Sequence, residues 1–454
     1  MVLAVVLILL TVGSIVFHFL SPQFGWWFTP IASNWGTIDD TIGITFWITG
    51  IVFVAVNLFV AIAIIRYRAR AGQKAAYEPE SKKLELWLTI ITAVGVAAML
   101  APGLFVWANF VQVPDDATEF EAVGQQWHWS FRLPGKDGVM GASETAYSNQ
   151  QNPFGLIPDD PNGQDDLLIE GDPLHLLVDQ PVKMLLRSKD VLHDFAVPQF
   201  RIKMDLVPGM VTYAWLTPTA TGSFEILCEE LCGIAHHAMR NRVVVDNQVN
   251  YDTWVETLPT FAETMAAAPG DPAAGAPLYA ACGACHGAQG EGIQLLNSPK
   301  LSGQEDWYLK RQIMNYKNGR RGTHQDDLFG SQMAPFVATL SDETAIDNVV
   351  AYIGTLPDTP AEATVTGDVE RGERLYEICG TCHGADGKGN WGVSAPQQAG
   401  MSDWYIAAQL KNFRRDIRGG HPEDAFGNQM AAMAKTLIDD EAINDVVAYI
   451  NTLQ

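Results

Sequence analysis

The sequence predicts a multi-domain, membrane-anchored chain in which transmembrane α-helices precede an antiparallel β-sandwich and two all-α domains. Three observations predict this order. Long apolar stretches lie near the N-terminus, alternating apolar and polar residues follow from about residue 112, and a 97-residue repeat occupies the C-terminal part. At 454 residues the chain also exceeds one ordinary domain.

The N-terminal region, residues 1–111, contains apolar stretches at about 1–20, 42–65 and 86–111. Each is long enough to span a bilayer, and the second and third have no charge in their interiors. The first could be a cleaved signal, but it lacks the basic residues that normally open one, so we expect a retained third span.

The sidedness follows from the loop between the second and third spans. Basic residues concentrate on the cytoplasmic side of membrane proteins. Everything after the third span is therefore expected on the outer side, which predicts a bacterial inner membrane protein with periplasmic domains. The basic loop residues are Arg66, Arg68, Arg70, Lys74, Lys82 and Lys83.

Residues 112–256 show the period-two alternation of β-strands, with turn residues such as Pro208-Gly209 between the runs. The stretch 134–166 is rich in Gly, Asn, Asp and Pro, which predicts a long surface loop. The Ala-, Pro- and Gly-rich stretch 257–276 predicts a linker.

The C-terminal part consists of two domains, 277–357 and 358–454, that repeat at an offset of 97 residues without a gap. Unlike residues recur at this offset, which indicates a duplicated module, and both copies end in a helical pattern. Examples of the matched pairs are Cys282 and Cys379, Trp307 and Trp404, His324 and His421, and Phe329 and Phe426.

The charge balance excludes one class of partner. The 29 Lys and Arg residues oppose 52 Asp and Glu residues, for a formal net charge of −23. Nucleic acid binding requires basic patches, so we expect none. An acidic surface keeps the chain soluble and can steer a basic partner.

The six cysteines form three close pairs, and a histidine follows each pair. A disulfide framework has no need of that histidine, whereas metal and haem sites do. The pairs are Cys228 with Cys232, Cys282 with Cys285, and Cys379 with Cys382.

The first pair belongs to a loop that also carries His236 and Met239. Soft sulfur ligands with imidazole suit copper, and a weak axial methionine is common in copper electron-transfer sites. Two thiolates can bridge two copper ions, and His193 is the candidate for a second imidazole. A structural zinc site or a disulfide is the alternative, but zinc leaves the methionine unexplained.

This pattern, CxExCGxxHxxM after the upstream Asp190-Val191-Leu192-His193, resembles the CuA domain of cytochrome c oxidase subunit II over residues from about 35 to 256. The resemblance implies a cupredoxin-like sandwich and a dinuclear copper centre. The implied ligands are His193, Cys228, Cys232, His236, Met239 and the main-chain carbonyl of Glu230. The resemblance also implies that the Glu230 carboxylate faces a magnesium site shared with subunit I.

Two further positions match that family. Trp127, in Gly124-Gln125-Gln126-Trp127-His128-Trp129, corresponds to the residue at which electrons enter the copper domain. A packing aromatic is the alternative. Glu85, at the start of the third span, corresponds to a glutamate at the mouth of a proton channel of subunit I, although a glutamate at a helix N-terminus also pairs with the helix dipole.

The other two cysteine pairs open CxxCH motifs, which are typical of covalent c-type haem attachment. A methionine follows each motif after about 47 residues, and His/Met ligation is a mark of electron carriers. Met433 is a rival to Met430, but it aligns with Phe336 rather than Met333. Both halves resemble class I cytochromes c, which implies as haem-binding residues Cys282, Cys285, His286, Met333, Cys379, Cys382, His383 and Met430.

Together these motifs predict subunit II of a proton-pumping cytochrome c oxidase of the caa type, an enzyme subunit that carries electrons but does not itself reduce oxygen. The resemblance implies partners: subunit I with haem a, haem a3 and CuB, subunit III, and cytochrome c or a bc1-type complex as electron donor. A subunit of a CuA-type nitric oxide reductase and a membrane-anchored electron shuttle are the alternatives.

Overall fold

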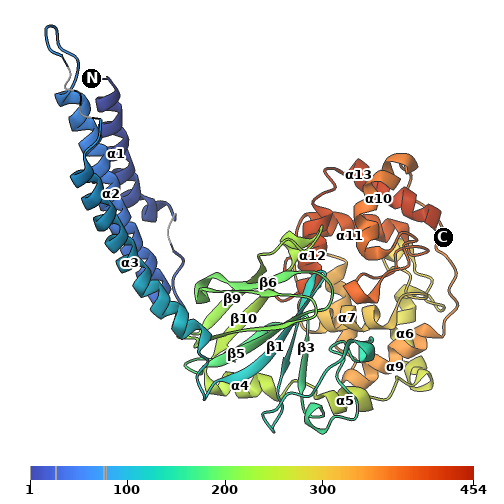
Figure 1. Ribbon diagram of the computed structural model, residues 1–454. Helices are drawn as coiled ribbons and strands as arrows, with labels where there is room; N and C mark the ends of the chain where they lie inside the picture. Colours follow the sequence, from blue (N-terminus) through green and yellow to red (C-terminus); the bar gives the residue numbers. More distant parts are fainter. Residues whose placement is uncertain (1, 26–27, 75–76, 78, 454) are drawn as a thin grey trace.

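The computed structural model describes residues 2–25, 28–74, 77 and 79–453. Met1 and Gln454, which begin the first predicted span and end the second C-terminal domain, lie outside the described residues. The described chain has three parts: a helical bundle, a β domain, and two helical modules that lie against the β domain (Figure 1). The predicted fold class is thus confirmed.

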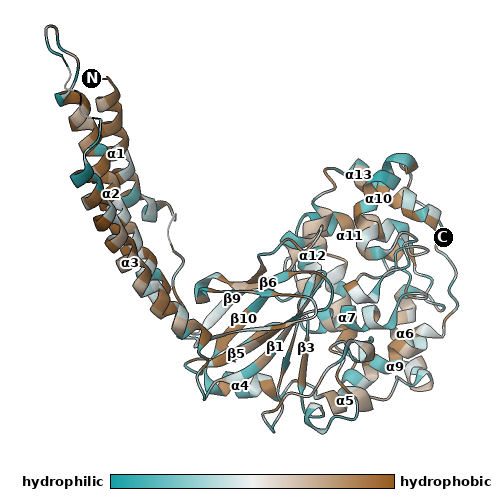
Figure 2. Cartoon of the chain, viewed as in Figure 1, coloured by the Kyte–Doolittle hydropathy of each residue, from teal (hydrophilic) through white to brown (hydrophobic). Residues whose placement is uncertain are grey.

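The bundle consists of three helices, each long and apolar enough to cross a membrane. Its side chains are almost all exposed in the isolated chain, and Figure 2 shows the apolar residues over the whole length of the bundle. Apolar surface of this extent requires lipid or other subunits around it. The helices are α1 (Val2–Leu20), α2 (Gly36–Arg66) and α3 (Lys82–Val111).

The β domain is a sandwich of two five-stranded sheets, in the orders β3-β2-β1-β5-β8 and β4-β10-β9-β6-β7. Most pairs are antiparallel as expected, but β1 pairs with β5, and β10 with β4, in parallel. Its strands are β1 (Thr118–Gln125), β2 (His128–Leu133), β3 (Leu167–Glu170), β4 (Leu174–Leu177), β5 (Val182–Ser188), β6 (His193–Val197), β7 (Ile202–Leu206), β8 (Val211–Leu216), β9 (Gly222–Cys228) and β10 (Arg240–Asp246).

Fully buried aromatic side chains from both sheets, including Trp129, Phe120 and Phe195, fill the space between them. Burial of this apolar surface is the main contribution that holds the sheets together. The same core continues to the loop between β9 and β10, so the loop with the first cysteine pair is fixed to a packed scaffold.

The segment after the sandwich differs from the linker expected at 257–276. Helix α4 (Gln248–Val255) follows β10, and a second helix, α5 (Phe261–Ala266), lies inside the expected linker. Thr260 and Glu263 form a reciprocal capping box at its start, and Phe261 is buried against the β domain. These contacts reduce the number of residues that can act as a free linker between the β domain and the first helical module.

The two helical modules repeat one arrangement. Module 1 contains α6 (Pro272–His286), α7 (Asp306–Lys317), α8 (Met333–Val337) and α9 (Glu343–Gly354). Module 2 contains the equivalents α10 (Val369–His383), α11 (Asp403–Arg414), α12 (Ala425–Ala434) and α13 (Asp440–Ile450).

In each module the first and last helices cross closely at a glycine. A Cβ at Gly275 would lie 1.9 Å from the carbonyl oxygen of Asn348, and one at Gly372 would lie 2.0 Å from that of Asp445. Larger residues would therefore push apart the helices that hold the CxxCH motifs.

Candidate metal centre and haem sites

Strand pairing brings the separate parts of the metal cluster together. His193 is the first residue of β6 and Cys228 the last residue of β9. The two strands are antiparallel neighbours in which Phe195 lies opposite Cys228. Residues 35 positions apart in sequence thus become neighbours at one edge of the sandwich.

The sulfur atoms lie at the centre of this cluster. Cys228 and Cys232 are free cysteines whose Sγ atoms are 3.6 Å apart, much farther than in a disulfide. The Nδ1 atom of His193 lies 3.9 Å from Cys228 Sγ, and that of His236 lies 3.5 Å from Cys232 Sγ. The ligand atoms of His193, Cys228 and Cys232 are close enough to hold one metal ion.

The remaining predicted ligands complete the same cluster. The Sδ atom of Met239 lies 3.8 Å from Cys232 Sγ, and the carbonyl oxygen of Glu230 lies 3.2 Å from Cys228 Sγ. Met239 and His193 are fully buried. All six predicted donor groups therefore converge on one buried site.

A carboxylate outside the cluster orients the first imidazole. The Nε2 atom of His193 lies 2.8 Å from an oxygen of Asp190. That contact leaves Nδ1 directed at the sulfur atoms, an arrangement common for metal-binding histidines. The hydrogen bond from Cys232 lowers the pKa of Cys228 below its ordinary value, so a thiolate is favoured at this position.

The two motif histidines of the helical modules are held alike. His286 and His383 each end a helix, α6 and α10 respectively, and both are buried. Nδ1 of His286 lies 2.7 Å from the carbonyl oxygen of Pro299, and Nδ1 of His383 lies 2.7 Å from that of Pro396. These contacts assign the proton to Nδ1 and leave Nε2 free to bind iron.

Burial lowers the pKa of both imidazoles below its ordinary value, which keeps them neutral as iron ligands require. A cavity of about 570 Å³ lies above His286 and is also lined by Met333, His383 and Met430. In each module, the donor groups and the apolar lining therefore fit a haem held by cysteine, histidine and methionine.

Comparison with known proteins assigns the family. The model for the periplasmic domain of cytochrome c oxidase subunit II matches residues 118–247, and the cytochrome c model matches 272–357 and 369–454. An alternative cytochrome c oxidase subunit 2 of Bradyrhizobium diazoefficiens is 60% identical over 262 residues, which are 58% of this chain and 94% of the relative.

This chain belongs to the cytochrome c oxidase subunit II family. A subunit 2 of Cereibacter sphaeroides is 28% identical over 46% of this chain and 74% of its own length. The reduced cytochrome c4 of Pseudomonas stutzeri is 27% identical to the chain, with a TM-score of 0.33, and the match covers 41% of this chain and all of that one.

These matches establish that the chain is the subunit II of a haem–copper terminal oxidase, and they do not favour the nitric oxide reductase or free-shuttle alternatives. The family implies copper in the β domain and haem c in both modules. Three membrane helices and a periplasmic domain agree with this family.

The two other predicted site residues of this subunit II lie in different surroundings. Trp127 is 3% exposed, and its indole NH donates to the carbonyl oxygen of Cys232 at 3.1 Å. An outside donor could not touch it directly. Glu85 lies in the first turn of α3, and Figure 1 shows that this helix begins at the end of the bundle away from the β domain.

Module 2 contacts the copper loop. Its attachment residue Cys382 and the neighbouring Met433 pack against the core that includes the loop cysteines, and α12 contacts the short helix at 236–238. Gln125, two residues before Trp127, donates a hydrogen bond to the carbonyl oxygen of Gly392.

One aromatic side chain packs at the centre of this contact. The ring of Phe426, on α12, lies 5.1 Å from the ring of His128 and 3.8 Å below the guanidinium of Arg311. It also fills the space beside Gly171, where a Cβ would lie 2.4 Å from it. Phe426 thus joins the β domain and both modules.

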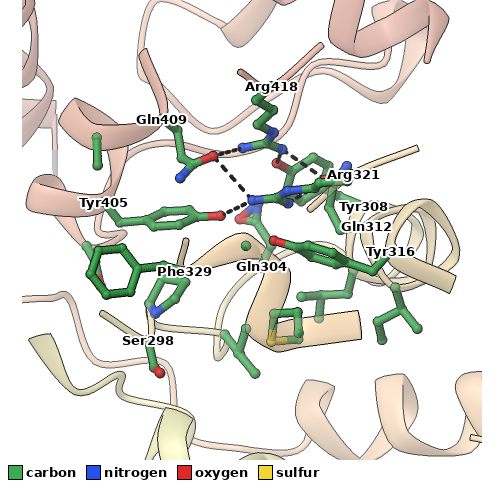
Figure 3. Close-up of a pocket in the computed structure, with 18 of the residues that line it drawn as sticks. Ser298, Gln304, Tyr308, Gln312, Tyr316, Arg321, Phe329, Tyr405, Gln409 and Arg418 are labelled. Atoms are coloured by element: carbon green, nitrogen blue, oxygen red, sulfur yellow. Dashed lines mark hydrogen bonds between the residues drawn. The ribbon is translucent and has the colours of Figure 1, made fainter. Parts of the chain in front are cut away.

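Two arginines meet between the modules, as Figure 3 shows. Arg321 of module 1 donates to the hydroxyl of Tyr405 at 2.5 Å, and Arg418 of module 2 donates to that of Tyr308 at 2.8 Å. Burial alone would raise the pKa of Tyr405, but the two guanidinium groups lower it. Both arginines line the large cavity.

Sequence reasoning missed this arginine pair and the fastening role of Phe426. A signal was present, because Arg321 and Arg418 also stand 97 residues apart, as do Tyr308 and Tyr405. The repeat alone does not indicate that equivalent residues face one another.

The choice between Met430 and Met433 leads to a testable prediction. Met430 packs against the core of its own module and lines both cavities next to His383. Met433 lines the smaller cavity only, and it packs against the β domain. Met430→Leu is expected to lower the potential of the module 2 haem, because a methionine ligand raises it, and to leave haem attachment intact. Met433→Leu should leave that potential near its original value. A redox titration of both variants tests this prediction. If Met433→Leu lowered the haem potential and Met430→Leu did not, Met433 would be the ligand.

Proposed function

We propose that this subunit II takes electrons from an outside donor at its cytochrome c modules and passes them through a dinuclear copper centre to subunit I, where O2 is reduced to water with proton pumping. The observation that carries the proposal is the contact between module 2 and the loop in which all six predicted copper donors converge. When bound, the haems and copper ions supply one-electron carriers at these two neighbouring places.

The copper donors fit a centre that changes little between oxidation states. Cys228 and Cys232 would bridge two ions, with His193 and His236 on either side. Met239 and the Glu230 carbonyl would be weaker ligands. Because the cluster is anchored to packed strands, its ligands are held in place before the metal binds.

Each haem would be fixed by two thioether bonds and one imidazole, from Cys282, Cys285 and His286 in module 1 and Cys379, Cys382 and His383 in module 2. Met333 and Met430 would close the other side of the iron. A haem held by histidine and methionine would supply one-electron transfer, which suits a carrier rather than a catalyst.

The buried arginine pair supports haem in this cavity. A guanidinium group is costly to bury without an anionic partner, and two lie together here. Haem carries two propionate groups, so Arg321 and Arg418 would neutralise propionates at the contact between the modules.

The contacts support different places for the two modules in the proposed route. Module 2 presents Cys382 to the copper domain, and module 1 lies behind it and shares the arginine cluster with it. Module 2 would therefore reduce copper directly, and module 1 would supply module 2. Trp127, beside the copper loop, would receive electrons from module 2 rather than from a soluble donor.

The remaining proposed features rest on the family alone. The carboxylate of Glu230 would contact a magnesium ion shared with subunit I, and Glu85 would stand at the mouth of a proton channel. Subunit III and either cytochrome c or a bc1-type complex are the proposed further partners. The proposed location is the bacterial inner membrane.

Cofactor content tests the proposal. The purified oxidase is expected to carry two covalent haems and two coppers in this chain, because it has two CxxCH motifs and one paired-cysteine loop. Haem staining after denaturing electrophoresis counts covalent haem, and metal analysis counts copper. One haem per chain, or zinc in place of copper, would contradict the proposal.

A further inference from the structure

The end of the β1–β2 hairpin places one polar side chain between the copper domain and module 2. Gln125 is the last residue of β1 and is 8% exposed. Its side-chain NH2 group donates a hydrogen bond to the carbonyl oxygen of Gly392 in module 2. Its side-chain oxygen accepts one from the ammonium group of Lys189, at 2.8 Å, in the β domain. The carboxamide therefore bridges two domains with both of its polar atoms in use.

The two partners fix the direction in which this carboxamide points. A main-chain carbonyl can only accept a hydrogen bond, so the NH2 group must face Gly392. Burial lowers the pKa of Lys189 to about 8, so at neutral pH its ammonium group stays mostly protonated and can only donate. The main-chain NH of Lys189 also donates to the carbonyl oxygen of Gly124 at 3.0 Å, which holds the lysine beside Gln125. A reversed carboxamide would place donor against donor and acceptor against acceptor.

The next residue in the chain connects the same hairpin to the copper cluster. The main-chain NH of Gln126 donates to one carboxylate oxygen of Asp190 at 2.7 Å, and the other oxygen lies 2.8 Å from Nε2 of His193. Asp190 directly follows Lys189 in the sequence. The residue that orients the carboxamide and the residue that orients a predicted copper ligand are therefore neighbours.

On the other side of the bridge, Gly392 belongs to the wall of the module 2 haem cavity. The two residues that follow it, Val393 and Ser394, line the smaller cavity together with His383. The main-chain NH of Gly392 donates to the side-chain oxygen of Asn390 at 3.0 Å, within module 2, whereas its carbonyl group faces the β domain. Loss of the bridge would thus free a wall of the haem cavity from the hairpin that supports the copper cluster.

We propose that Gln125 is a positioning residue for electron transfer from module 2 to copper. It holds the wall of the haem cavity against the hairpin, in the single orientation that Lys189 and Gly392 allow. This inference rests on the proposed function and names a residue outside the metal and haem ligands. One electron passes from the haem, which changes from ferrous to ferric, to the copper centre, which is reduced by one electron. No proton or bond is exchanged.

The test removes one hydrogen-bond donor in the purified oxidase complex. Gln125→Glu keeps the size of the side chain and its contact with Lys189, but it places an oxygen against the carbonyl oxygen of Gly392. We expect haem-to-copper electron transfer, measured after flash reduction of the haems, to slow by about tenfold, because a buried acceptor loses its donor. The haem and copper potentials and the electron paramagnetic resonance signal of copper should stay near their original values, since no ligand is altered.

An exchange of two side chains separates this role from simple packing. In Gln125→Lys with Lys189→Gln, a donor remains at position 125, and the charge moves to the neighbouring side chain. We expect this double variant to recover the transfer rate to within about threefold of the original, because Gly392 keeps its hydrogen bond. Gln125→Met, which fills a similar volume without a donor, should remain about tenfold slow.

Gln180→Glu is the matched control. The side-chain NH2 group of Gln180 also donates to a main-chain carbonyl, that of Asp116 at 2.9 Å, but both residues belong to the β domain. The transfer rate should stay unchanged in this variant. An original rate in Gln125→Glu and Gln125→Met, an equal loss in Gln180→Glu, or no recovery in the exchanged pair would overturn the role of Gln125. If no electron passes from the haems to copper in the original complex, the proposed function fails instead.

Discussion

Replacing Cys228 with serine is expected to abolish the dinuclear copper centre. A hydroxyl is a poor ligand for a soft metal, and the loss of one bridging thiolate removes the link between the two ions. Electron transfer to subunit I should stop, while both haems are still reduced, because their attachment residues lie in other domains. Metal analysis and electron paramagnetic resonance of the purified complex measure the first effect, and stopped-flow absorbance measures the second.

Met239→Leu is the matched control for this variant. Its sulfur lies in the same cluster, 3.8 Å from Cys232 Sγ, but a thioether is a weak ligand. We expect copper to remain with a changed redox potential. If Cys228→Ser retained the mixed-valence copper signal, the assignment of the ligands would be wrong.

Phe426→Ala is expected to slow electron transfer from the module 2 haem to copper by about ten- to a hundredfold. The ring contacts His128, Arg311 and Gly171 at once. Truncating a packed aromatic side chain costs about 3 kcal/mol of packing free energy. Each 1.4 kcal/mol shifts a docking equilibrium about tenfold. Flash reduction of the complex with a small reductant isolates this internal step.

The repeat supplies the control for this second variant. Phe329 occupies the equivalent position in module 1, where it is 54% exposed. Phe329→Ala should leave the internal haem-to-copper rate unchanged. An equal loss in both variants, or no loss with Phe426→Ala, would show that copper does not receive its electrons across this contact.

The fold also alters the expectation of a tethered cytochrome. A 20-residue linker at 257–276 would give module 1 a wide range of positions. Instead α5 is capped by Thr260 and held by Phe261, and Arg320 of module 1 forms an ion pair with Asp172 of the β domain at 2.5 Å. The composition of this segment predicted a flexible linker. It could not predict these contacts, because they depend on residues far away in the chain.

The sequence by itself determined the chemistry of this protein, because metal and haem ligation depend on residue types at fixed short spacings. The CxxCH motifs, the loop from Cys228 to Met239 and the apolar spans are all local patterns. Which module lies against the copper loop was decided only by the tertiary structure. Two copies of one module have the same local pattern, and what distinguishes them is the β domain, which packs against Phe426 and leaves Phe329 exposed. Such packing is set by surface complementarity between segments hundreds of residues apart, which no local spacing records.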